Sequence, residues 1–230
     1  MRRPRPLEIS MLLTLLASMP LGLVAQSPVT VSGELDFKTR YLFAGIPFAA
    51  DEVTQAKITV ASGSFTFNAF SVYDVDASEV TEGDIWGDYY RQLSPAVGLF
   101  VGAAIYSFKI AGEWDQTAEA YGGLVFTGPL TPTVYFAHDF DLGDGSHATL
   151  TLSQSVPLGM SGATLDFAGS LDYNDHYYTI DSGFSFVDFA VSVGIPAGPL
   201  TISPTVLVQR GIRDDFTDEE LFGVKAAFVF

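Results

Sequence analysis

Hydrophobic and polar residues alternate along most of the chain. In residues 29–43 the odd-numbered positions are apolar almost throughout, ending in Tyr41 and Phe43. The even-numbered positions include four consecutive charged side chains, Glu34, Asp36, Lys38 and Arg40. Successive side chains of a strand point to opposite faces, so this pattern predicts a strand with one apolar and one charged face.

The same alternation recurs up to the last residue. Residues 163–174 and 222–230 repeat it clearly. Weaker alternation predicts further strands at residues 54–61, 64–75, 84–93, 97–109, 117–127, 132–140, 147–156, 184–195 and 200–210. Together these segments predict about twelve strands, and no segment has the pattern of a substantial helix.

The links between the predicted strands alternate between long and short. Short links such as residues 62–63 and 94–96 contain Gly, Pro and Ser, as tight turns require. Most long links are acidic, at residues 45–53, 74–83, 110–116, 141–146, 175–183 and 211–219. A membrane-crossing up-and-down barrel has short turns on one side and longer loops on the other, so we expect both termini on the short-turn, periplasmic side.

A closed sheet follows from the chemistry of lipid. Every backbone N–H and C=O group in hydrocarbon must be paired, and a strand of about 9–11 residues crosses the bilayer. We therefore predict an all-β protein, a transmembrane up-and-down antiparallel β-barrel of about twelve strands. The length of 230 residues accommodates such a barrel with modest loops and leaves no plug domain.

The first residues have the order of a secretory signal. Arg2, Arg3 and Arg5 precede an apolar stretch at residues 9–24, and a small-residue cleavage site follows near Ala25. The stretch is short for a membrane anchor and contains Pro20, which favours the signal over the anchor. We expect residues 1–25 to be a signal peptide, residues 26–230 to form a single barrel, and the mature protein to lie in the bacterial outer membrane.

Composition narrows the function classes. Eleven Lys and Arg against 27 Asp and Glu give a formal net charge of −16, which argues against nucleic-acid binding. The chain contains no cysteine, so disulfides, thiolate metal sites and a cysteine-linked lipid anchor are excluded. A hydrophobic content of 48% with 19 Phe and 10 Tyr favours strands facing lipid.

The chain ends in Phe230, with Phe228 on the same face of the last predicted strand. A terminal Phe after an alternating apolar strand resembles the C-terminal signal that the barrel-assembly machinery recognises in outer-membrane proteins. The alternative is simply an apolar last strand.

A family resemblance is found near the start of the mature chain. Residues 38–47 read KTRYLFAGIP, with Gln55 and residues 65–73 beyond. They resemble the opening of the Gcw_chp-type family, exported bacterial proteins of unknown function, although Ala44 stands where that family often has Arg. The resemblance implies an outer-membrane-type barrel and transfers no catalytic residues.

Candidate chemistry is sparse, and we expect no cofactor, no metal and no catalytic residue. His138 and His147 flank an acidic link, but their spacing matches no metal motif. A Ser–His hydrolase would need Ser153 or Ser155 beside His138 or His176. The aromatic residues near predicted strand ends are interpreted as interfacial girdles, with ligand stacking as the alternative: Tyr41, Phe43, Tyr73, Trp86, Tyr89, Tyr90, Tyr135, Phe136, Tyr173, Tyr177 and Tyr178.

Charged residues on the polar faces are the remaining functional candidates. A charge facing lipid costs about 2–4 kcal/mol for a basic group at the midplane, so these side chains should face the lumen. The candidates for selectivity are Glu34, Asp36, Lys38, Arg40, Lys57, Asp166 and Asp172. We expect a narrow passive, porin-like channel for small solutes or cations. The alternative is a non-conducting structural or surface-binding barrel, with an enzyme as a third reading.

The acidic links also predict partners outside the lumen. A negative rim raises the local concentration of divalent cations, and Ca²⁺ or Mg²⁺ there would bridge to anionic lipopolysaccharide. The expected partners are therefore outer-membrane lipid and lipopolysaccharide, divalent cations at the acidic loops, and the barrel-assembly machinery.

Overall fold

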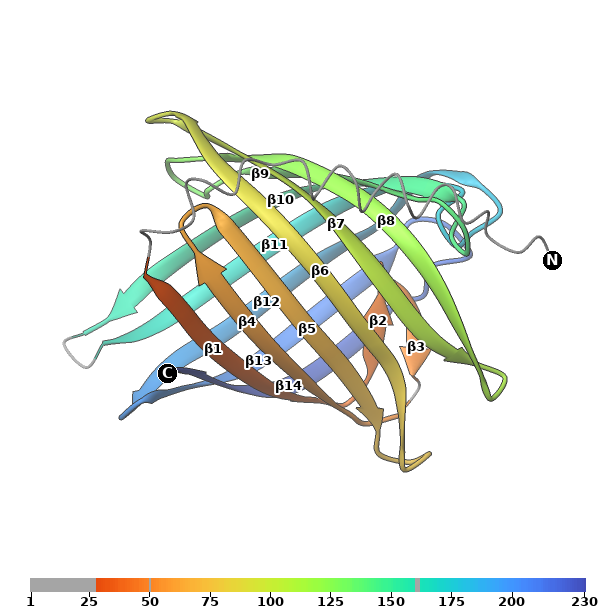
Figure 1. Cartoon of the computed structure of the whole chain (residues 1–230), viewed down its shortest axis with the longest axis horizontal. Coiled ribbons are helices and arrows are strands. Elements are labelled where there is room, and N and C mark those ends of the chain that lie inside the picture. Colours follow the sequence, from red (N-terminus) through yellow and green to blue (C-terminus); the bar gives the residue numbers. More distant parts are fainter. Residues whose placement is uncertain (1–27, 50, 160–161) are drawn as a thin grey trace.

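Twelve antiparallel strands close into one barrel (Figure 1). The computed structural model describes residues 28–49, 51–159 and 162–230, so the predicted signal peptide at residues 1–25 lies outside the described residues. Each strand pairs with its sequence neighbour, and β1 closes the barrel by pairing with β14 on one side and β4 on the other. The prediction of an all-β up-and-down barrel is confirmed.

The strands of the barrel wall follow the predicted segments closely. Their bounds are β1 Val29–Lys38, β4 Val53–Ser62, β5 Phe65–Asp74, β6 Glu79–Ser94, β7 Val97–Ile110, β8 Glu113–Phe126, β9 Thr133–Asp139, β10 Gly145–Leu158, β11 Ala163–Asp175, β12 Ser182–Ala197, β13 Leu200–Gly211 and β14 Glu219–Val229. None of the described residues forms a helix long and apolar enough to cross a membrane.

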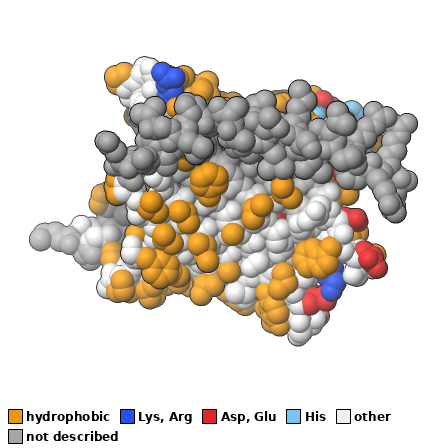
Figure 2. Space-filling view, in the orientation of Figure 1, with side chains coloured by type: hydrophobic (Ala, Val, Ile, Leu, Met, Phe, Trp, Pro, Cys, Tyr) orange, Lys and Arg blue, Asp and Glu red, His pale blue; other side chains and the backbone are white. Residues whose placement is uncertain are grey.

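The two faces of the wall differ as the alternation predicts. Leu35 on β1 and Phe222 on β14 point outward and are 51% and 57% exposed. Glu34 and Lys57, which are partners in the register of β1 and β4, share the inner face and form an ion pair. Apolar side chains cover the visible outer wall, while acidic side chains gather at its right-hand end (Figure 2). The barrel therefore presents an apolar belt to its surroundings, and its acidic side chains lie inside or at one end, whereas the basic Arg91 is exposed near the opposite end, close to the end of β6.

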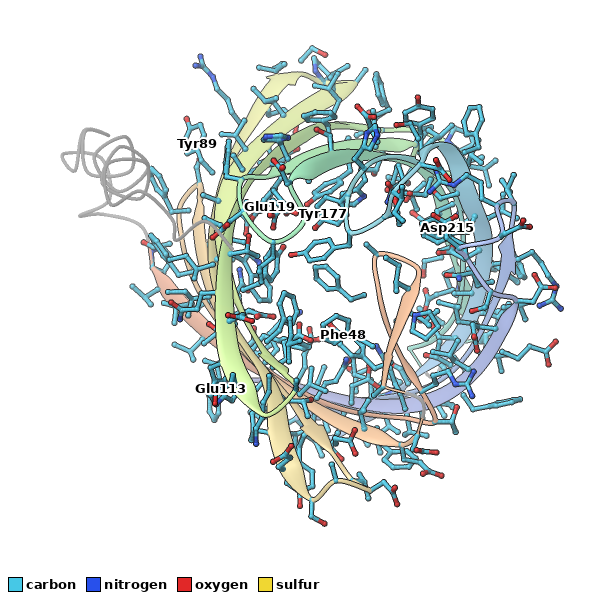
Figure 3. All side chains as sticks on the ribbon, turned by 90° about the vertical axis from the view of Figure 1, so that its right-hand side faces the viewer. Phe48, Tyr89, Glu113, Glu119, Tyr177 and Asp215 are labelled. Atoms are coloured by element: carbon cyan, nitrogen blue, oxygen red, sulfur yellow. The ribbon has the colours of Figure 1, made fainter. Side chains whose placement is uncertain are left out.

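The predicted end of the first strand is wrong. Residues 29–43 were expected to form one strand, but β1 ends at Lys38. The chain then folds into a separate hairpin of β2 (Tyr41–Phe43) and β3 (Ile46–Ala49). Viewed along the barrel, this hairpin lies inside the ring of strands (Figure 3). The apolar residues after Lys38 alternate as a strand would, but they are buried against the inner wall instead of facing lipid.

The strict alternation of long and short links is also wrong. On the side expected to carry long links, the connections at residues 75–78 and 111–112 are short, because β6 and β8 begin at Glu79 and Glu113. On the other side, the connection at residues 127–132 is longer than a tight turn. The ends of the barrel are here called the long-link end, where residues 39–52, 140–144, 176–181 and 212–218 connect the strands, and the short-turn end. The described start of β1 and the C-terminal residue both lie at the short-turn end, where Val29 pairs with Ser62 and the Phe230 amide donates to Val31.

Candidate functional site

Aromatic rings from three parts of the chain meet inside the barrel near the long-link end. The centre of this group is Phe43 on β2, whose ring lies 5.1 Å from Phe108, 5.4 Å from Tyr106 and 5.5 Å from Tyr178, measured between centroids. We call the whole group the aromatic cluster; its members are Tyr41, Phe43, Phe48, Tyr106, Phe108, Tyr177 and Tyr178. Phe48 and Tyr177 point toward each other across the lumen (Figure 3). Edge-to-face contacts of this kind add to the burial of the rings, so the cluster holds the hairpin and the 176–181 link inside the barrel.

Polar contacts fix the hairpin to opposite sides of the wall. The Gln209 side chain on β13 donates to the Gly45 carbonyl at the hairpin turn, at 2.8 Å. On the other side the Tyr41 hydroxyl donates to Glu82 on β6, also at 2.8 Å. Arg40, just before the hairpin, forms an ion pair with Glu219 on β14. The hairpin is therefore bound to the wall at its base and at its tip.

Two buried carboxylates, Glu119 and Asp139, accept hydrogen bonds from the 176–181 link in the same region. Glu119 on β8 accepts from the hydroxyls of Tyr106, Tyr135 and Tyr177. Burial, and then the nearby Glu119 carboxylate, raise the pKa of Tyr177, so its hydroxyl keeps the proton that it donates. Glu119 thus joins hydroxyls from β7, β9 and the 176–181 link in one network.

A second carboxylate organises the neighbouring link. Asp139, fully buried at the end of β9, accepts from the backbone amides of Asp141 and Gly143 at 2.9 and 2.8 Å. It also accepts from the hydroxyls of Thr117 and Tyr178. One side chain therefore anchors the 140–144 link and connects it to the aromatic cluster.

An open cavity of about 480 Å³ lies beside the aromatic cluster and extends toward the short-turn end. Aromatic rings and carboxylates from β5 to β9 line most of it, and Lys57 on β4 and two rings of the hairpin line the rest. The residues around it are Tyr41, Phe43, Lys57, Phe70, Glu82, Asp84, Trp86, Asp88, Phe100, Tyr106, Tyr121 and Tyr135. It has the size of a small-molecule site.

Most of the predicted lumen charges are paired with a neighbour. Lys57 lies 3.1 Å from Glu34, and Lys38 lies 3.4 Å from Asp36. All four side chains are partly exposed on the inner face. The basic residues on β1 and β4 are thus compensated locally, Lys38 by a residue of its own strand and Lys57 by a residue of the adjacent strand.

Asp166 and Asp172 differ although both are on β11. Asp166 accepts from Thr164 at 2.9 Å and remains partly exposed. Asp172 is buried and accepts from Thr149, Ser185 and His147 at 2.7, 2.6 and 3.2 Å. Asp172 therefore acts as a hydrogen-bond centre in the wall, and of the two only Asp166 can act directly on a passing ion.

The acidic residues closest to the aromatic cluster were missed by the sequence interpretation. Glu82 was assigned to an outer link, but it belongs to β6 and faces the lumen with Asp84. Glu119 was within a weakly alternating strand and received no role. The available signal was the spacing of acids at Glu82, Asp84 and Asp88, all at even-numbered positions with Trp86 at the remaining one, which continues the alternation of the strand upstream of residue 84.

The girdle interpretation is wrong for about half of the aromatic residues. Tyr73, Phe136 and Tyr173 point outward, and Tyr89 lies on the outer face of the barrel (Figure 3). The following residues instead belong to the aromatic cluster or line the cavity: Tyr41, Phe43, Trp86, Tyr135, Tyr177 and Tyr178. Proximity to a strand end determines how far a ring lies from the membrane midplane, but it does not determine whether the ring faces the lipid or the lumen.

The histidines do not come together. His138 pairs with Ser146 across β9 and β10, while His147 pairs with Ala137, so the two imidazoles lie on opposite faces of the wall. Within residues 28–49, 51–159 and 162–230 no cluster of three or more His, Asp or Glu has a geometry that could hold a metal ion.

Neither serine of the hydrolase alternative contacts a histidine in the part of the chain that is described. His176 instead lies 2.8 Å from Asp175 and 3.0 Å from Ser182. Both contacts use the same ring nitrogen, Nδ1, whereas a catalytic triad needs one partner on each nitrogen. This exposed group therefore lacks the geometry of a nucleophile and its base.

The C-terminal aromatic pair lies on the outer face at the short-turn end. The rings of Phe228 and Phe230 are 5.0 Å apart, and Phe228 lies over Gly33 on β1, where a Cβ atom would be 2.5 Å from the ring. Phe230 is 81% exposed. The pair is therefore accessible at the seam where β14 closes on β1.

Solved structures similar to this chain are outer-membrane barrels. The KdgM porin in complex with disordered oligogalacturonate superposes with a TM-score of 0.56 at 9% sequence identity, covering 87% of this chain and 99% of that one. The KdgM porin alone gives a TM-score of 0.55 at 10% identity with the same coverage. At this identity the likeness shows the fold, that of a porin-like barrel of the outer membrane. No relative among the curated proteins matches the chain.

A family model, by contrast, matches almost the whole chain. The match runs over residues 23–225, well beyond the short segment that carries the sequence resemblance, and its description is "Bacterial protein of unknown function (Gcw_chp)". The chain belongs to the Gcw_chp family of bacterial proteins.

Proposed function

We propose that this protein is a narrow passive channel of the bacterial outer membrane that admits small cations in preference to anions. The observation that carries the proposal is the inner face of the closed barrel, which is polar and has more carboxylates than cationic groups. Lys38, Arg40 and Lys57 each have an acidic partner. Asp88, Asp166 and Asp188 have no Lys or Arg within ion-pair distance among the described residues.

Negative charge in a narrow pore lowers the barrier for cations. At 0.1 M salt the Debye length is about 10 Å, so charges on the lumen wall act more strongly than charges on the outer links. The selectivity candidates that remain accessible to an ion are Glu34, Asp36, Lys38, Arg40, Lys57 and Asp166. Asp172 is not accessible to an ion and acts only through its hydrogen bonds within the barrel wall.

Selectivity can be measured as a reversal potential across a salt gradient. Replacing Asp36 and Asp166 together, as Asp36→Asn and Asp166→Asn, should shift the reversal potential toward that of anions, because two lumen carboxylates are lost. The exposed link residue Asp76 provides a matched control, and Asp76→Asn should leave the potential unchanged. An unshifted potential in the double variant would show that these lumen residues do not set selectivity.

A second candidate function is a non-conducting barrel that stabilises the membrane or displays its links. The aromatic cluster favours it, because the hairpin and the 176–181 link occupy the lumen near the long-link end (Figure 3). Current through the wild-type protein separates the two candidates.

The exposed acidic residues at the long-link end support a role for divalent cations. We propose that Ca²⁺ or Mg²⁺ bridges them to lipopolysaccharide. We also propose that the half-buried Phe228 and the exposed Phe230 are recognised by the barrel-assembly machinery. The exposed acids are Asp51, Glu52, Asp76, Glu113, Asp115, Asp144, Asp175, Asp181, Asp214, Asp215, Asp218 and Glu220.

Removal of divalent cations tests the bridging. In vesicles that contain lipopolysaccharide, EDTA should lower the unfolding temperature of the barrel by several degrees, because uncompensated carboxylates then face anionic lipid. In zwitterionic phospholipid without lipopolysaccharide, EDTA should have no effect. The same unfolding temperature with and without EDTA in lipopolysaccharide would contradict the bridging.

A further inference from the structure

Three carboxylates line the cavity without a cationic partner. Glu82, Asp84 and Asp88 are two and four residues apart on β6, so they lie on the same inner face. In the described residues no Lys or Arg forms an ion pair with any of them. Lys57 also lines the cavity, two strands from Asp84 in the register of β4, β5 and β6, and it is engaged with Glu34 at 3.1 Å. The carboxylates that line the cavity therefore outnumber its one cationic side chain, whose charge is already paired.

One of these carboxylates has an unused acceptor. Glu82 is 1% exposed, and its Oε1 accepts from the Tyr41 hydroxyl at 2.8 Å. Its Oε2 is buried and has no hydrogen-bond partner among the described residues. A buried carboxylate oxygen without a partner is costly, and the usual solutions are a bound cation or a proton.

The other walls of the cavity are aromatic. Phe70 and Trp86 lie 6.2 Å apart on one side, and Phe100, Tyr121 and Tyr135 form a stack on another, with centroids 5.7 and 6.1 Å apart. The negative face of an aromatic ring attracts a cation, and cages of such rings bind quaternary ammonium groups. A metal ion would need more oxygen ligands converging on one point, and no such group is found in the described chain.

We infer that this lumen cavity is a binding site for a small organic cation, with an ammonium group held over the Trp86 ring between the carboxylates of Asp84 and Asp88, which flank Trp86 on the same face of β6. The ammonium charge compensates the acidic side of the cavity, while its carbon atoms contact Phe70, Trp86 and Phe100. This inference rests on the proposed function in one respect, that the lumen admits solutes, and it names their class.

Tryptophan fluorescence gives a direct measurement of binding. The chain has two tryptophans: Trp86 lines the cavity, and Trp114 is exposed on the outer face. In the Trp114→Phe variant, folded in detergent, choline should change the fluorescence of Trp86 saturably. The uncharged isostere 3,3-dimethylbutan-1-ol has the same shape and should produce a change at least tenfold weaker. Equal responses to both, or no saturable response to choline, would overturn the proposal.

Variants of the carboxylates locate the site. The double variant Asp84→Asn and Asp88→Asn, made in the Trp114→Phe background, should bind choline at least tenfold more weakly than its parent. Glu113→Gln, an acid exposed at the start of β8, is the matched control and should bind as the parent does. Heat-modified migration in gels verifies that each variant is a folded barrel. Unchanged affinity in the folded double variant would also overturn the proposal.

The binding measurement needs no current. A barrel that conducts but does not respond to choline would contradict only the inferred site, and one that binds choline but does not conduct would contradict only the proposed channel.

Discussion

A Gly45→Ala variant should conduct several times more current than the wild-type barrel. Gly45 forms the turn of the inner hairpin with Ala44, and both have positive φ, of 80° and 46°. A Cβ atom on residue 45 would lie 2.2 Å from the Phe186 ring, so the hairpin turn could not keep its place against the wall. Releasing the hairpin separates Phe43 and Phe48 from Phe108 and Tyr178 and opens the part of the lumen that the hairpin occupies.

The control for this variant is a second turn glycine. Gly112 has a φ of 87°, but nothing lies within 4 Å of the position that its Cβ atom would take. Gly112→Ala therefore introduces the same backbone strain of about 1–2 kcal/mol without a clash, and it should conduct as the wild type does. Equal single-channel conductance in the two variants would show that the hairpin does not limit the pore.

Replacing Asp139 by Ala should cost the barrel about 2–4 kcal/mol of unfolding free energy. The change removes the acceptor of three backbone amides and two hydroxyls at the base of the 140–144 link. Hydrogen bonds to a charged group are worth about 1.5–3 kcal/mol each, and buried donors left without acceptors add to the loss. Urea unfolding in lipid vesicles measures the difference.

Asp144 provides the comparison, because it lies in the same link but is exposed. Asp144 has a φ of 40°, a left-handed conformation that Asn tolerates better than Ala, so the comparison variant is Asp144→Asn. It should change the unfolding free energy by no more than about 0.5 kcal/mol, as is usual for surface positions. If both variants unfold at the same urea concentration, the 140–144 link does not depend on the buried carboxylate.

The strands could be predicted because lipid and lumen impose opposite polarity on alternate residues. Residues 163–174 illustrate this: β11 runs from Ala163 to Asp175 with its acids facing inward. The lengths of the links were predicted less accurately than the strands. Glu79 and Glu113 are polar like link residues, yet they extend β6 and β8, since strands that project beyond the membrane no longer need apolar outer faces.

The candidate site was harder to predict, because alternation does not distinguish an inner from an outer surface. Tyr41 and Phe43 continue the apolar pattern of β1, but a turn after Lys38 directs them into the lumen. Glu82 has the composition of an acidic loop and is nevertheless buried beneath Tyr41. Both features depend on contacts between segments far apart in sequence, such as that of Gln209 with Gly45.

The central claim is that the barrel conducts, and single-channel recording of the refolded wild-type protein in a planar bilayer tests it most directly. In symmetric KCl the account predicts discrete, small current steps, and in a salt gradient a reversal potential on the cation-selective side. A bilayer that contains folded, heat-modifiable barrel and shows no steps above those of detergent alone would contradict the account and favour a non-conducting barrel.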